Sequence, residues 1–449
     1  MNATATRAGK AVIVGLGRSG VSAARHLVRR GWRLAVTDSR VEPPGVASLR
    51  ELAPDAPLRT GGFDASLLEG ASLVVASPGV SLAEPMLARA RALGIEVVGD
   101  IELFGRATRG VPTIGITGTN GKSTVTTLVG RMAARAGRKV RVGGNLGPPA
   151  LELLEEPGEV ELYVLELSSF QLEATSTLEL VAGAVLNLTA DHLDRHADMQ
   201  AYGAAKARIF AHCATAVVNA DDERVAAMPR PGQVVRRFSL REGVAADYSI
   251  ALRAGEGWLM RGAQPLIPLS QMRLAGLHNA ANAAASVALG EAAGLPMAAM
   301  LEELREFTGL RHRAQFVAEI RGVRYIDDSK GTNVGATLAA VAGLPGTLVL
   351  VAGGDGKGQD FRPLAAALRG RVRVAVLIGR DAAAIEAALG DACPVRRSAT
   401  LEEAVQVASE VAEAGDTVLL SPACASLDMF RDYTHRGEVF AAAVRRLAS

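Results

Sequence analysis

The chain has 449 residues, of which 49% are hydrophobic, and a chain of this length is expected to form about three domains, each with its own core. Its 49 Lys and Arg residues balance 47 Asp and Glu residues, so no basic surface for nucleic acid or a membrane is expected, and the expected ligands are small molecules. Three widely spaced cysteines and the lack of a long apolar run argue against disulfides and membrane insertion, and they favour a cytoplasmic location.

Strand and helix patterns alternate along the chain, which predicts an α/β fold with parallel sheets covered by helices. An apolar strand that runs into "GLGRSG" opens a Rossmann-like N-terminal block over residues 1–107. A strand in "TIGITG" opens a central block over residues 108–311, with a parallel sheet like that of P-loop ATPases. Four short apolar strands predict a smaller, Rossmann-like C-terminal block over residues 312–449.

The first glycine-rich loop contains Gly15, Gly17 and Gly20. This spacing after a strand is typical of a dinucleotide site, and Asp38 at the end of the next strand would bind a ribose hydroxyl. The alternative is a tight turn between strand and helix that binds nothing.

The second glycine-rich loop, "GITGTNGKST" at residues 115–124, departs from the usual P-loop pattern. That pattern places a glycine five residues before Gly121, where this chain has Ile116. The loop nevertheless follows a strand and precedes a helix, so its N–H groups are expected to bind phosphate, with Lys122 on the outer phosphates and Ser123 on Mg²⁺. The alternative is a turn in which Ser123 or Thr124 caps the helix.

Candidate metal ligands follow the loop. Glu166 interrupts the apolar strand in "YVLELSSFQLE", where a buried charge needs a cation or a strong donor, and the alternative is a structural ion pair. In "NLTADHLDRH", His192 and His196 are spaced for a zinc pair, but neither the glutamate of a zinc hydrolase nor a nearby cysteine accompanies them.

Taken in order, "GITGTNGKST", "ELSSFQLE", "NLTADHLDRH", "AYGAAKARIF", "GLHNAANAAA", "GLRHRAQFV" and "IDDSKGTN" resemble the ATP-dependent Mur ligases of bacterial cell-wall synthesis. Within that family, "DDSKGTN", "GGDGKGQDF" and "LLSPACASLDMF" are similar to the members that add D-glutamate. The resemblance covers all three blocks. It also accounts for the displaced glycine, because T-G-T-N-G-K-S is a loop variant shared by the Mur and folylpolyglutamate ligases.

The resemblance implies that the chain joins D-glutamate to UDP-N-acetylmuramoyl-L-alanine with ATP, through an acyl phosphate. It implies two Mg²⁺ ions, with Ser123, Glu166 and His192 as ligands. Lys206 in "AYGAAKARIF" matches a lysine that carries a carbamate, which would also bind Mg²⁺, whereas a solvated surface cation is the ordinary interpretation of such a lysine. The catalytic residues implied are Lys122, Glu166, His192 and Lys206.

The resemblance also assigns binding residues, and a monomer is expected. ATP is expected to contact Gly118, Thr119, Asn120, Gly121, Lys122, Ser123, Thr124, Asn279, Asn282, Arg313 and Asp328. The UDP-linked substrate is expected to contact Leu16, Ser39, Arg40, Ser77, Gly79 and Asn145. D-Glutamate is expected to contact Lys330, Thr332, Lys357, Ser426 and Tyr433.

Two positions depart from the family pattern: Gly331 stands where alanine is common, and Tyr433 where phenylalanine is expected. Three alternative functions remain in view. A folylpolyglutamate synthase would not need the N-terminal block, a nicotinamide oxidoreductase would leave residues 115–124 unused, and a non-catalytic nucleotide-binding protein would need neither Glu166 nor His192. We expect the three domains to close over the reactants, with hinges near 107–112 and 310–314.

Overall fold

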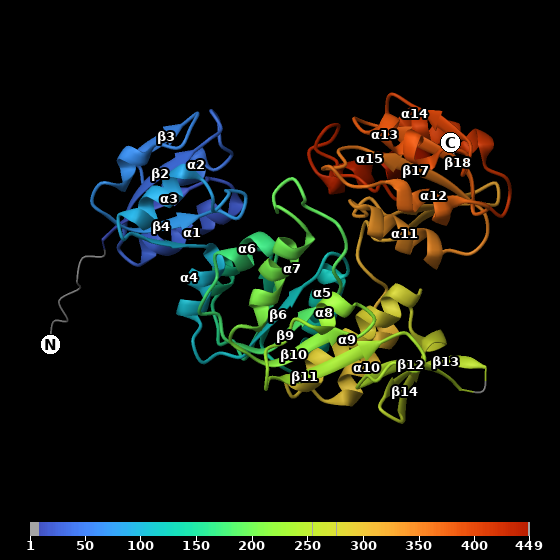
Figure 1. The fold of residues 1–449 in the computed structure, drawn as a ribbon, viewed down its shortest axis with the longest axis horizontal. Helices are drawn as coiled ribbons and strands as arrows, with labels where there is room; N and C mark the ends of the chain where they lie inside the picture. Colours follow the sequence, from blue (N-terminus) through green and yellow to red (C-terminus); the bar gives the residue numbers. More distant parts are fainter. Residues whose placement is uncertain (1–8, 254, 275, 448–449) are drawn as a thin grey trace.

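The computed structural model describes residues 9–253, 255–274 and 276–447. It has a mixed α/β fold with three sheets, each in its own domain, and the N- and C-terminal domains flank the central one (Figure 1). Among the described residues, no helix is both long enough and apolar enough to cross a membrane.

The N-terminal domain is a five-stranded parallel sheet in the order β3-β2-β1-β4-β5, which confirms the Rossmann-like prediction. Strand β1 ends where Gly15 takes a φ of +93°, and a Cβ at Gly20 would lie 2.1 Å from the Gly15 carbonyl oxygen, so the chain turns here with no room for side chains. The elements are β1 (Lys10–Val14), α1 (Arg18–Arg29), β2 (Arg33–Asp38), α2 (Val46–Leu52), β3 (Leu58–Thr60), η1 (Ala65–Leu68), β4 (Ala71–Ala76), α3 (Pro85–Ala92), β5 (Glu96–Val98) and α4 (Asp100–Ala107).

The central domain holds a nine-stranded sheet in the order β14-β13-β12-β11-β10-β9-β6-β8-β7. It is parallel from β7 to β12, as expected, but β12, β13 and β14 pair antiparallel, which the sequence analysis did not predict. Gly262, at a φ of +54°, lies between β13 and β14. The strands are β6 (Thr113–Thr117), β7 (Val140–Gly144), β8 (Leu162–Glu166), β9 (Leu180–Val185), β10 (Cys213–Asn219), β11 (Val234–Ser239), β12 (Tyr248–Arg253), β13 (Glu256–Arg261) and β14 (Gln264–Pro268).

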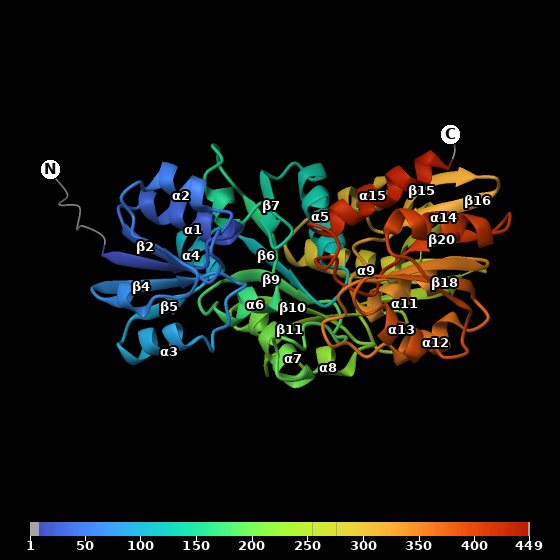
Figure 2. The ribbon, with the colours of Figure 1, turned by 90° about the horizontal axis from the view of Figure 1, so that it is seen from above.

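Helices cover both faces of the central sheet, with α5 and α7 on opposite faces (Figure 2). The long helices α5 and α9 pack on each other and on the face that includes Ile114 and Ile116. The helices are α5 (Lys122–Arg135), η2 (Ala150–Leu154), α6 (Ser169–Glu173), α7 (Met199–Ala207), η3 (Arg208–Phe210), α8 (Glu223–Ala226), η4 (Leu269–Gln271), α9 (Leu277–Ala292) and α10 (Met297–Glu306).

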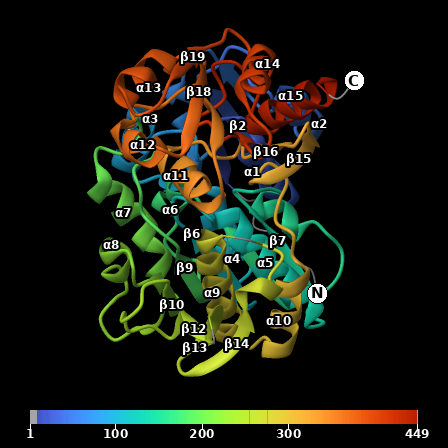
Figure 3. The same cartoon turned by 90° about the vertical axis from the view of Figure 1, so that its right-hand side faces the viewer.

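The C-terminal domain has a six-stranded sheet in the order β15-β16-β20-β17-β18-β19, parallel except at β15. Helices α11, α12 and α13 cover one face, and α14 and α15 cover the other. Helix α11 lies on the side that faces the central domain (Figures 1 and 3). The elements are β15 (Gln315–Ile320), β16 (Val323–Asp327), α11 (Val334–Gly343), β17 (Leu348–Gly353), α12 (Arg362–Leu368), β18 (Val372–Ile378), α13 (Ala382–Leu389), β19 (Val395–Arg397), α14 (Leu401–Val411), β20 (Thr417–Leu420) and α15 (Tyr433–Arg446).

The hydrophobic cores are distributed unequally among the domains. One continuous buried cluster contains residues of both the N-terminal and the central domain, with the rings of Phe104 and Tyr163 5.0 Å apart across their junction. Within the described residues, the two clusters of the C-terminal domain contain no residue of the other domains. Among the described residues, a buried apolar cluster therefore connects the first two domains, and none connects the third domain to them.

Candidate active site

The loop at residues 115–124 connects β6 to α5, and its backbone requires glycine. Gly118 and Gly121 have φ values of +147° and +84°, and a Cβ at Gly121 would lie 2.5 Å from Asn282 Oδ1. Lys122 folds back onto its own loop, with Nζ 3.0 Å from the Gly118 carbonyl oxygen and 2.7 Å from that of Thr119. Burial is the main cause of a lowered pKa at Lys122, and the nearby carboxylates of Glu166 and Asp191 act to raise it.

Glu166 lies at the end of β8 beside this loop and is 2% exposed. Its Oε1 accepts a hydrogen bond of 2.6 Å from Asn145 Nδ2, while its buried Oε2 has no partner among the described residues. Burial acts to raise the pKa of Glu166, but the positive charge of Lys122 and the neighbouring Ser123 and Asn145 side chains outweigh it and lower the pKa. A buried, ionised oxygen without a partner beside a serine hydroxyl fits Mg²⁺.

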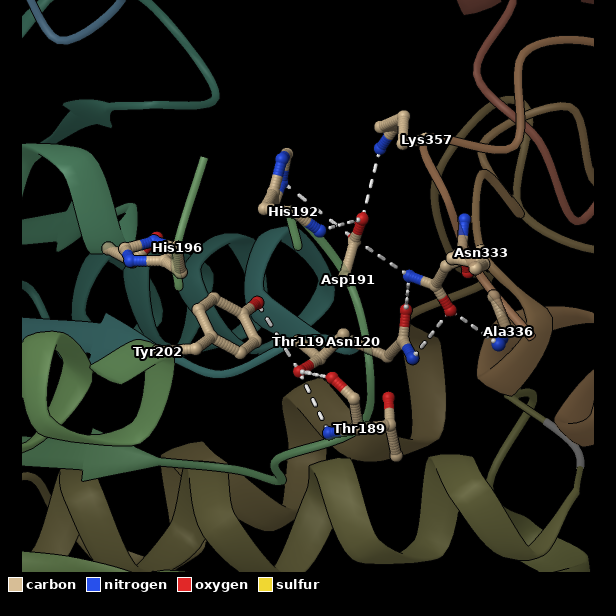
Figure 4. A network of polar contacts seen from close by, with 12 residues as sticks. Thr119, Asn120, Thr189, Asp191, His192, His196, Tyr202, Asn333, Ala336 and Lys357 are labelled. Carbon is tan, nitrogen blue, oxygen red and sulfur yellow. Dashed lines mark hydrogen bonds and ion pairs between the residues drawn. The ribbon is translucent and has the colours of Figure 1, made fainter. Parts of the chain in front are cut away.

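His192 lies in the same cavity, at a left-handed φ of 56°. Burial lowers its pKa to about 4, so the ring is neutral near pH 7 and has a nitrogen lone pair for a metal ion. His196 points elsewhere, with Nε2 3.0 Å from Ser169 Oγ (Figure 4). Among the described residues, no group of three or more His, Cys, Asp or Glu side chains could hold a metal ion, and nothing here favours the zinc alternative.

Lys206 projects from α7 toward the loop and is 2% exposed. Its Nζ donates to the Gly118 carbonyl oxygen at 2.8 Å and lies 4.4 Å from the centre of the Tyr202 ring. Burial lowers the pKa of Lys206 well below its ordinary value, which favours the neutral amine. The interpretation as a solvated surface cation is therefore wrong for this lysine.

The C-terminal domain contributes Lys330, Thr332 and Lys357 to the same cavity. Lys357 Nζ lies 3.0 Å from Asp191 Oδ1 of the central domain (Figure 4). Lys330 Nζ lies 3.8 Å from the centre of the Tyr433 ring, and burial lowers the pKa of Lys330 to about 8. Tyr433 therefore lies beside Lys330, but neither Tyr433 nor the buried Ser426 is among the residues that line the cavity.

A second cavity, of about 270 Å³, lies between the central and C-terminal domains. Asn279, Asn282, Arg313 and Asp328 all line it, together with Asn120, Gly121 and Thr124 of the loop. Asn282 Nδ2 donates to Asn279 Oδ1 at 3.2 Å, and Arg313 reaches the Ser123 hydroxyl at 2.9 Å. Burial raises the pKa of Asp328 to about 7. The cavity adjoins the phosphate loop, as an adenosine site must.

A third cavity, of about 430 Å³, lies at the N-terminus of α1 and reaches the central domain at Asn145. Ser39, Arg40, Ser77 and Gly79 line it as expected, but Leu16 is fully buried and is absent from the lining, where Arg18 and Ser19 are found. The Leu16 N–H instead donates to Asp38 Oδ2 at 2.6 Å. Gln171 also lines this cavity, and the sequence analysis assigned no role to Gln171, Arg18 or Ser19.

Asn145 lines both this cavity and the one that contains Lys122 and Glu166. A substrate bound at the N-terminus of α1 can therefore extend past Asn145 to the phosphate loop. The arrangement brings a nucleotide-sized cavity, a phosphate loop, oxygen and nitrogen ligands for a metal ion, and a cationic third domain to one place.

The fold is that of solved Mur ligases. UDP-N-acetylmuramate-alanine ligase MurC from Thermotoga maritima is 20% identical, with a TM-score of 0.62 over 98% of this chain and 99% of that one. A pseudomurein peptide ligase type C from Methanothermus fervidus is 17% identical, with a TM-score of 0.63 over 98% of this chain and 100% of that one.

The chain belongs to the Mur ligase family, as the sequence motifs predicted. Residues 9–99 match the Mur ligase MurD-like N-terminal domain, residues 116–290 the Mur ligase middle domain, and residues 312–424 the Mur ligase glutamate ligase domain. A protein of Nitrosococcus oceani named UDP-N-acetylmuramoylalanine--D-glutamate ligase is 54% identical over 98% of both chains. One of the same name from Methylococcus capsulatus is 49% identical over 98% of this chain and 95% of that one.

Proposed function

We propose that this chain is an ATP-dependent ligase that joins D-glutamate to UDP-N-acetylmuramoyl-L-alanine in peptidoglycan precursor synthesis, releasing ADP and phosphate. The observation that carries the proposal is the single cavity in which Lys122, Glu166 and His192 of the central domain face Lys330 and Lys357 of the third. The names of the relatives support the choice of substrates. We further propose that it acts in the cytoplasm as a monomer.

The three cavities suggest where each reactant binds. The UDP group would occupy the cavity at α1, with the muramoyl-alanine end directed past Asn145. ATP would place adenosine between Asn279 and Asp328 and its phosphates on the loop. D-Glutamate would bind to the third domain, with its carboxylates on the cationic side chains of Lys330 and Lys357.

Two steps then form the amide. The terminal carboxylate of the UDP-linked substrate attacks the γ-phosphorus of ATP, so that an acyl phosphate forms and ADP leaves. The amine of D-glutamate attacks the acyl carbon, loses a proton, and expels phosphate from the tetrahedral intermediate. Lys122 and the loop N–H groups hold the phosphate oxygens, and closure of the domains excludes water that would hydrolyse the acyl phosphate.

We propose that Ser123 and Glu166 hold one Mg²⁺, and that His192 and a carbamate on Lys206 help to hold a second. Mg²⁺ would neutralise charge on the phosphate and carboxylate oxygens. The neutral Lys206 amine attacks CO₂, forms a C–N bond and releases a proton, which leaves an anionic carbamate able to bind Mg²⁺. The support is the burial of Lys206 and its lowered pKa, because only the unprotonated amine reacts in this way.

Phosphate release from ATP tests the proposal. Purified protein is given UDP-N-acetylmuramoyl-L-alanine with D-glutamate, L-glutamate, L-lysine or meso-diaminopimelate, and the product is identified by mass spectrometry. We expect turnover only with D-glutamate. Preferential use of lysine or diaminopimelate would overturn the substrate assignment, and phosphate release that needs no amino acid would overturn the ligase assignment.

A further inference from the structure

Asn333 uses every hydrogen-bonding position of its side chain and is 2% exposed (Figure 4). Its Oδ1 accepts from the Ala336 N–H at 2.8 Å, which caps the N-terminus of α11, and from Asn120 Nδ2 at 3.2 Å. Its Nδ2 donates to Asn120 Oδ1 at 3.1 Å and to Asp191 Oδ2 at 3.2 Å. One side chain of the third domain is thus bound to two segments of the central domain.

Asn120 belongs to the phosphate loop and is itself held in place. Its N–H donates to Asn187 Oδ1 at 2.8 Å, and its carbonyl oxygen accepts from Asn187 Nδ2 at 3.0 Å. The reciprocal pair between Asn120 and Asn333 therefore connects a fixed part of the loop to the first turn of α11. A displacement of the loop relative to α11 breaks both bonds of the pair at once.

Asp191 links Asn333 to Lys357, a residue proposed to bind the amino acid. Its Oδ2 accepts from Asn333, and its Oδ1 accepts from Lys357 Nζ at 3.0 Å. Lys357 lies beyond β17 and Asn333 at the start of α11, so two separate loops of the third domain meet at one carboxylate. Asn333 also follows directly on Lys330, Gly331 and Thr332 in the sequence.

We propose that Asn333 is a positioning residue that couples the phosphate loop to the amino-acid-binding domain, so that a nucleotide on the loop strengthens the binding of the amino acid. The proposal rests on the proposed ligase function, in which the loop takes ATP and the third domain takes D-glutamate. The Asn120–Asn333 pair is expected to form in full only when the two domains meet, and any ligand that favours that arrangement favours the other ligand as well.

Only asparagine supplies this set of bonds at position 333. Aspartate retains the helix cap but loses both donors and places a carboxylate against Asp191. Serine also caps a helix, but its single hydroxyl cannot reach the three other partners. Asn333→Ser therefore removes the contacts of this side chain with Asn120 and Asp191 while keeping the stabilising cap of α11.

The experiment measures kcat and the KM values of D-glutamate, ATP and UDP-N-acetylmuramoyl-L-alanine for wild type and Asn333→Ser. We expect the D-glutamate KM to rise by about 10-fold, for the loss of several hydrogen bonds, with the KM of the UDP-linked substrate unchanged. A second measurement compares the D-glutamate Kd with and without a non-hydrolysable ATP analogue. The analogue should tighten binding to wild type and have little effect on the variant.

Thr400→Ala is the matched control, because it removes the N-cap of α14 in the same domain, away from the cavity. If Thr400→Ala raises the D-glutamate KM as much as Asn333→Ser does, the effect is general destabilisation and the proposal fails. Wild-type KM values and an intact analogue effect in Asn333→Ser also overturn it. If wild type makes no product with D-glutamate, the proposed function fails instead.

Asn120→Ser removes the partner of Asn333 in the central domain, and it replaces Asn333→Ser as the test if that variant does not fold. We expect Asn120→Ser to weaken the analogue effect on D-glutamate Kd, and we expect the double variant to be no worse in this respect than Asn333→Ser. Independent, multiplicative losses in the double variant would show that the two asparagines do not act as a pair and would overturn the proposal.

Discussion

The two junctions of the central domain are built differently. At the N-terminal junction, a shared apolar cluster is reinforced by Glu102, whose carboxylate accepts hydrogen bonds from the N–H groups of Ser176 and Thr177 at 2.7 and 2.9 Å. The C-terminal junction has the polar contacts Asn120–Asn333, Asp191–Lys357 and Ser123–Arg313. Separating an apolar junction exposes hydrophobic surface to water at a large cost in free energy. When a polar junction separates, water molecules can form hydrogen bonds in place of those that are lost.

The difference between the two junctions indicates which domain moves when ligands bind. The connecting segment at the C-terminal junction has left-handed backbone at His312 and Ala314, with φ values of 64° and 45°. We expect this hinge to carry most of the closing motion and the segment at 107–112 to carry little. In the proposed binding sites, the reacting groups would lie at the polar junction and the nucleotide end of the substrate would lie beside the apolar one.

The largest effect is expected from Lys122→Ala, which removes the cation from the phosphate loop at the polar junction. Loss of a charge that stabilises the transition state should lower kcat by about 1,000-fold. Circular dichroism and thermal unfolding should match wild type, as should those of the control Lys139→Ala, an exposed lysine paired with Glu159. Near-normal turnover of a folded Lys122→Ala variant would remove the loop from the mechanism.

Lys206→Ala should lower activity by about 100-fold or more, because the proposed carbamate, an anionic metal ligand, could no longer form. Formate or acetate should restore part of the activity by occupying the space of the carbamate, and neither acid should help Lys122→Ala. A wild-type mass increase equal to one CO₂, absent from Lys206→Ala, should be visible under native conditions. Full activity of Lys206→Ala without added acid would contradict the carbamate.

Lys357→Ala removes the ion pair with Asp191 and should raise the D-glutamate KM by about 10- to 100-fold, equivalent to about 1.5–3 kcal/mol for a charge-assisted contact. The KM values for ATP and the UDP-linked substrate should stay close to wild type. The exposed Arg362→Ala serves as the control within the same domain. An unchanged D-glutamate KM would place the amino acid elsewhere.

Glu102→Gln tests the other junction and should lower the free energy of unfolding by about 1–2 kcal/mol at pH 7. Burial acts to raise the pKa of Glu102, but hydrogen bonds from Ser176, Thr177 and Arg106 outweigh it and hold the pKa below its ordinary value of 4.5. The ionised group therefore stabilises the fold above pH 4.5, and this contribution disappears as the pH falls through the folded-state pKa.

The pH dependence of stability in Glu102→Gln should accordingly be weaker than in wild type below pH 4.5. Urea unfolding at a series of pH values measures it, with the exposed Glu42→Gln as the control. An identical pH dependence in Glu102→Gln and wild type would show that the carboxylate does not hold this junction.

The smallest expected effect is a change in the distance between the central and C-terminal domains when ligands bind. The three native cysteines are buried, so fluorophores can be placed on Arg89→Cys, Arg224→Cys and Glu410→Cys in the three domains. With ATP analogue, UDP-linked substrate and D-glutamate, energy transfer between positions 224 and 410 should increase, while that between 89 and 224 should stay nearly constant. The opposite result would move the hinge to 107–112.

The sequence predicted those parts of the fold and site that are formed by residues close together in the chain. The strand, glycine loop and helix at residues 113–135 are contiguous, so the position of Lys122 followed from the sequence alone. The burial of Lys206 could not be predicted in this way, because helix α7 has no strong pattern of apolar residues. The amine is shielded from water only by the tertiary position of the helix. The resemblance placed Leu16 at the nucleotide, whereas the cavity is lined by Arg18 and Ser19, the first two residues of α1.

Two features required the assembled molecule. Strands β12 to β14 extend the central sheet antiparallel, and their short alternating segments gave no sign of that direction. Asn333 lies in a quoted motif, yet its partners Asn120 and Asp191 are distant in sequence, and no spacing rule connects them. Contacts between domains depend on how folded units meet, which a single sequence does not display.

The apolar cluster shared by the first two domains also bears on how the chain folds and unfolds. Because residues such as Phe104 and Tyr163 lose their packing together, the N-terminal and central domains should melt as one cooperative unit. The third domain has complete cores of its own and should melt as a second unit. The chain thus folds into three domains but is expected to unfold in two cooperative units. A protease that cuts near residue 311 should release a folded fragment, and a cut near residue 107 should not.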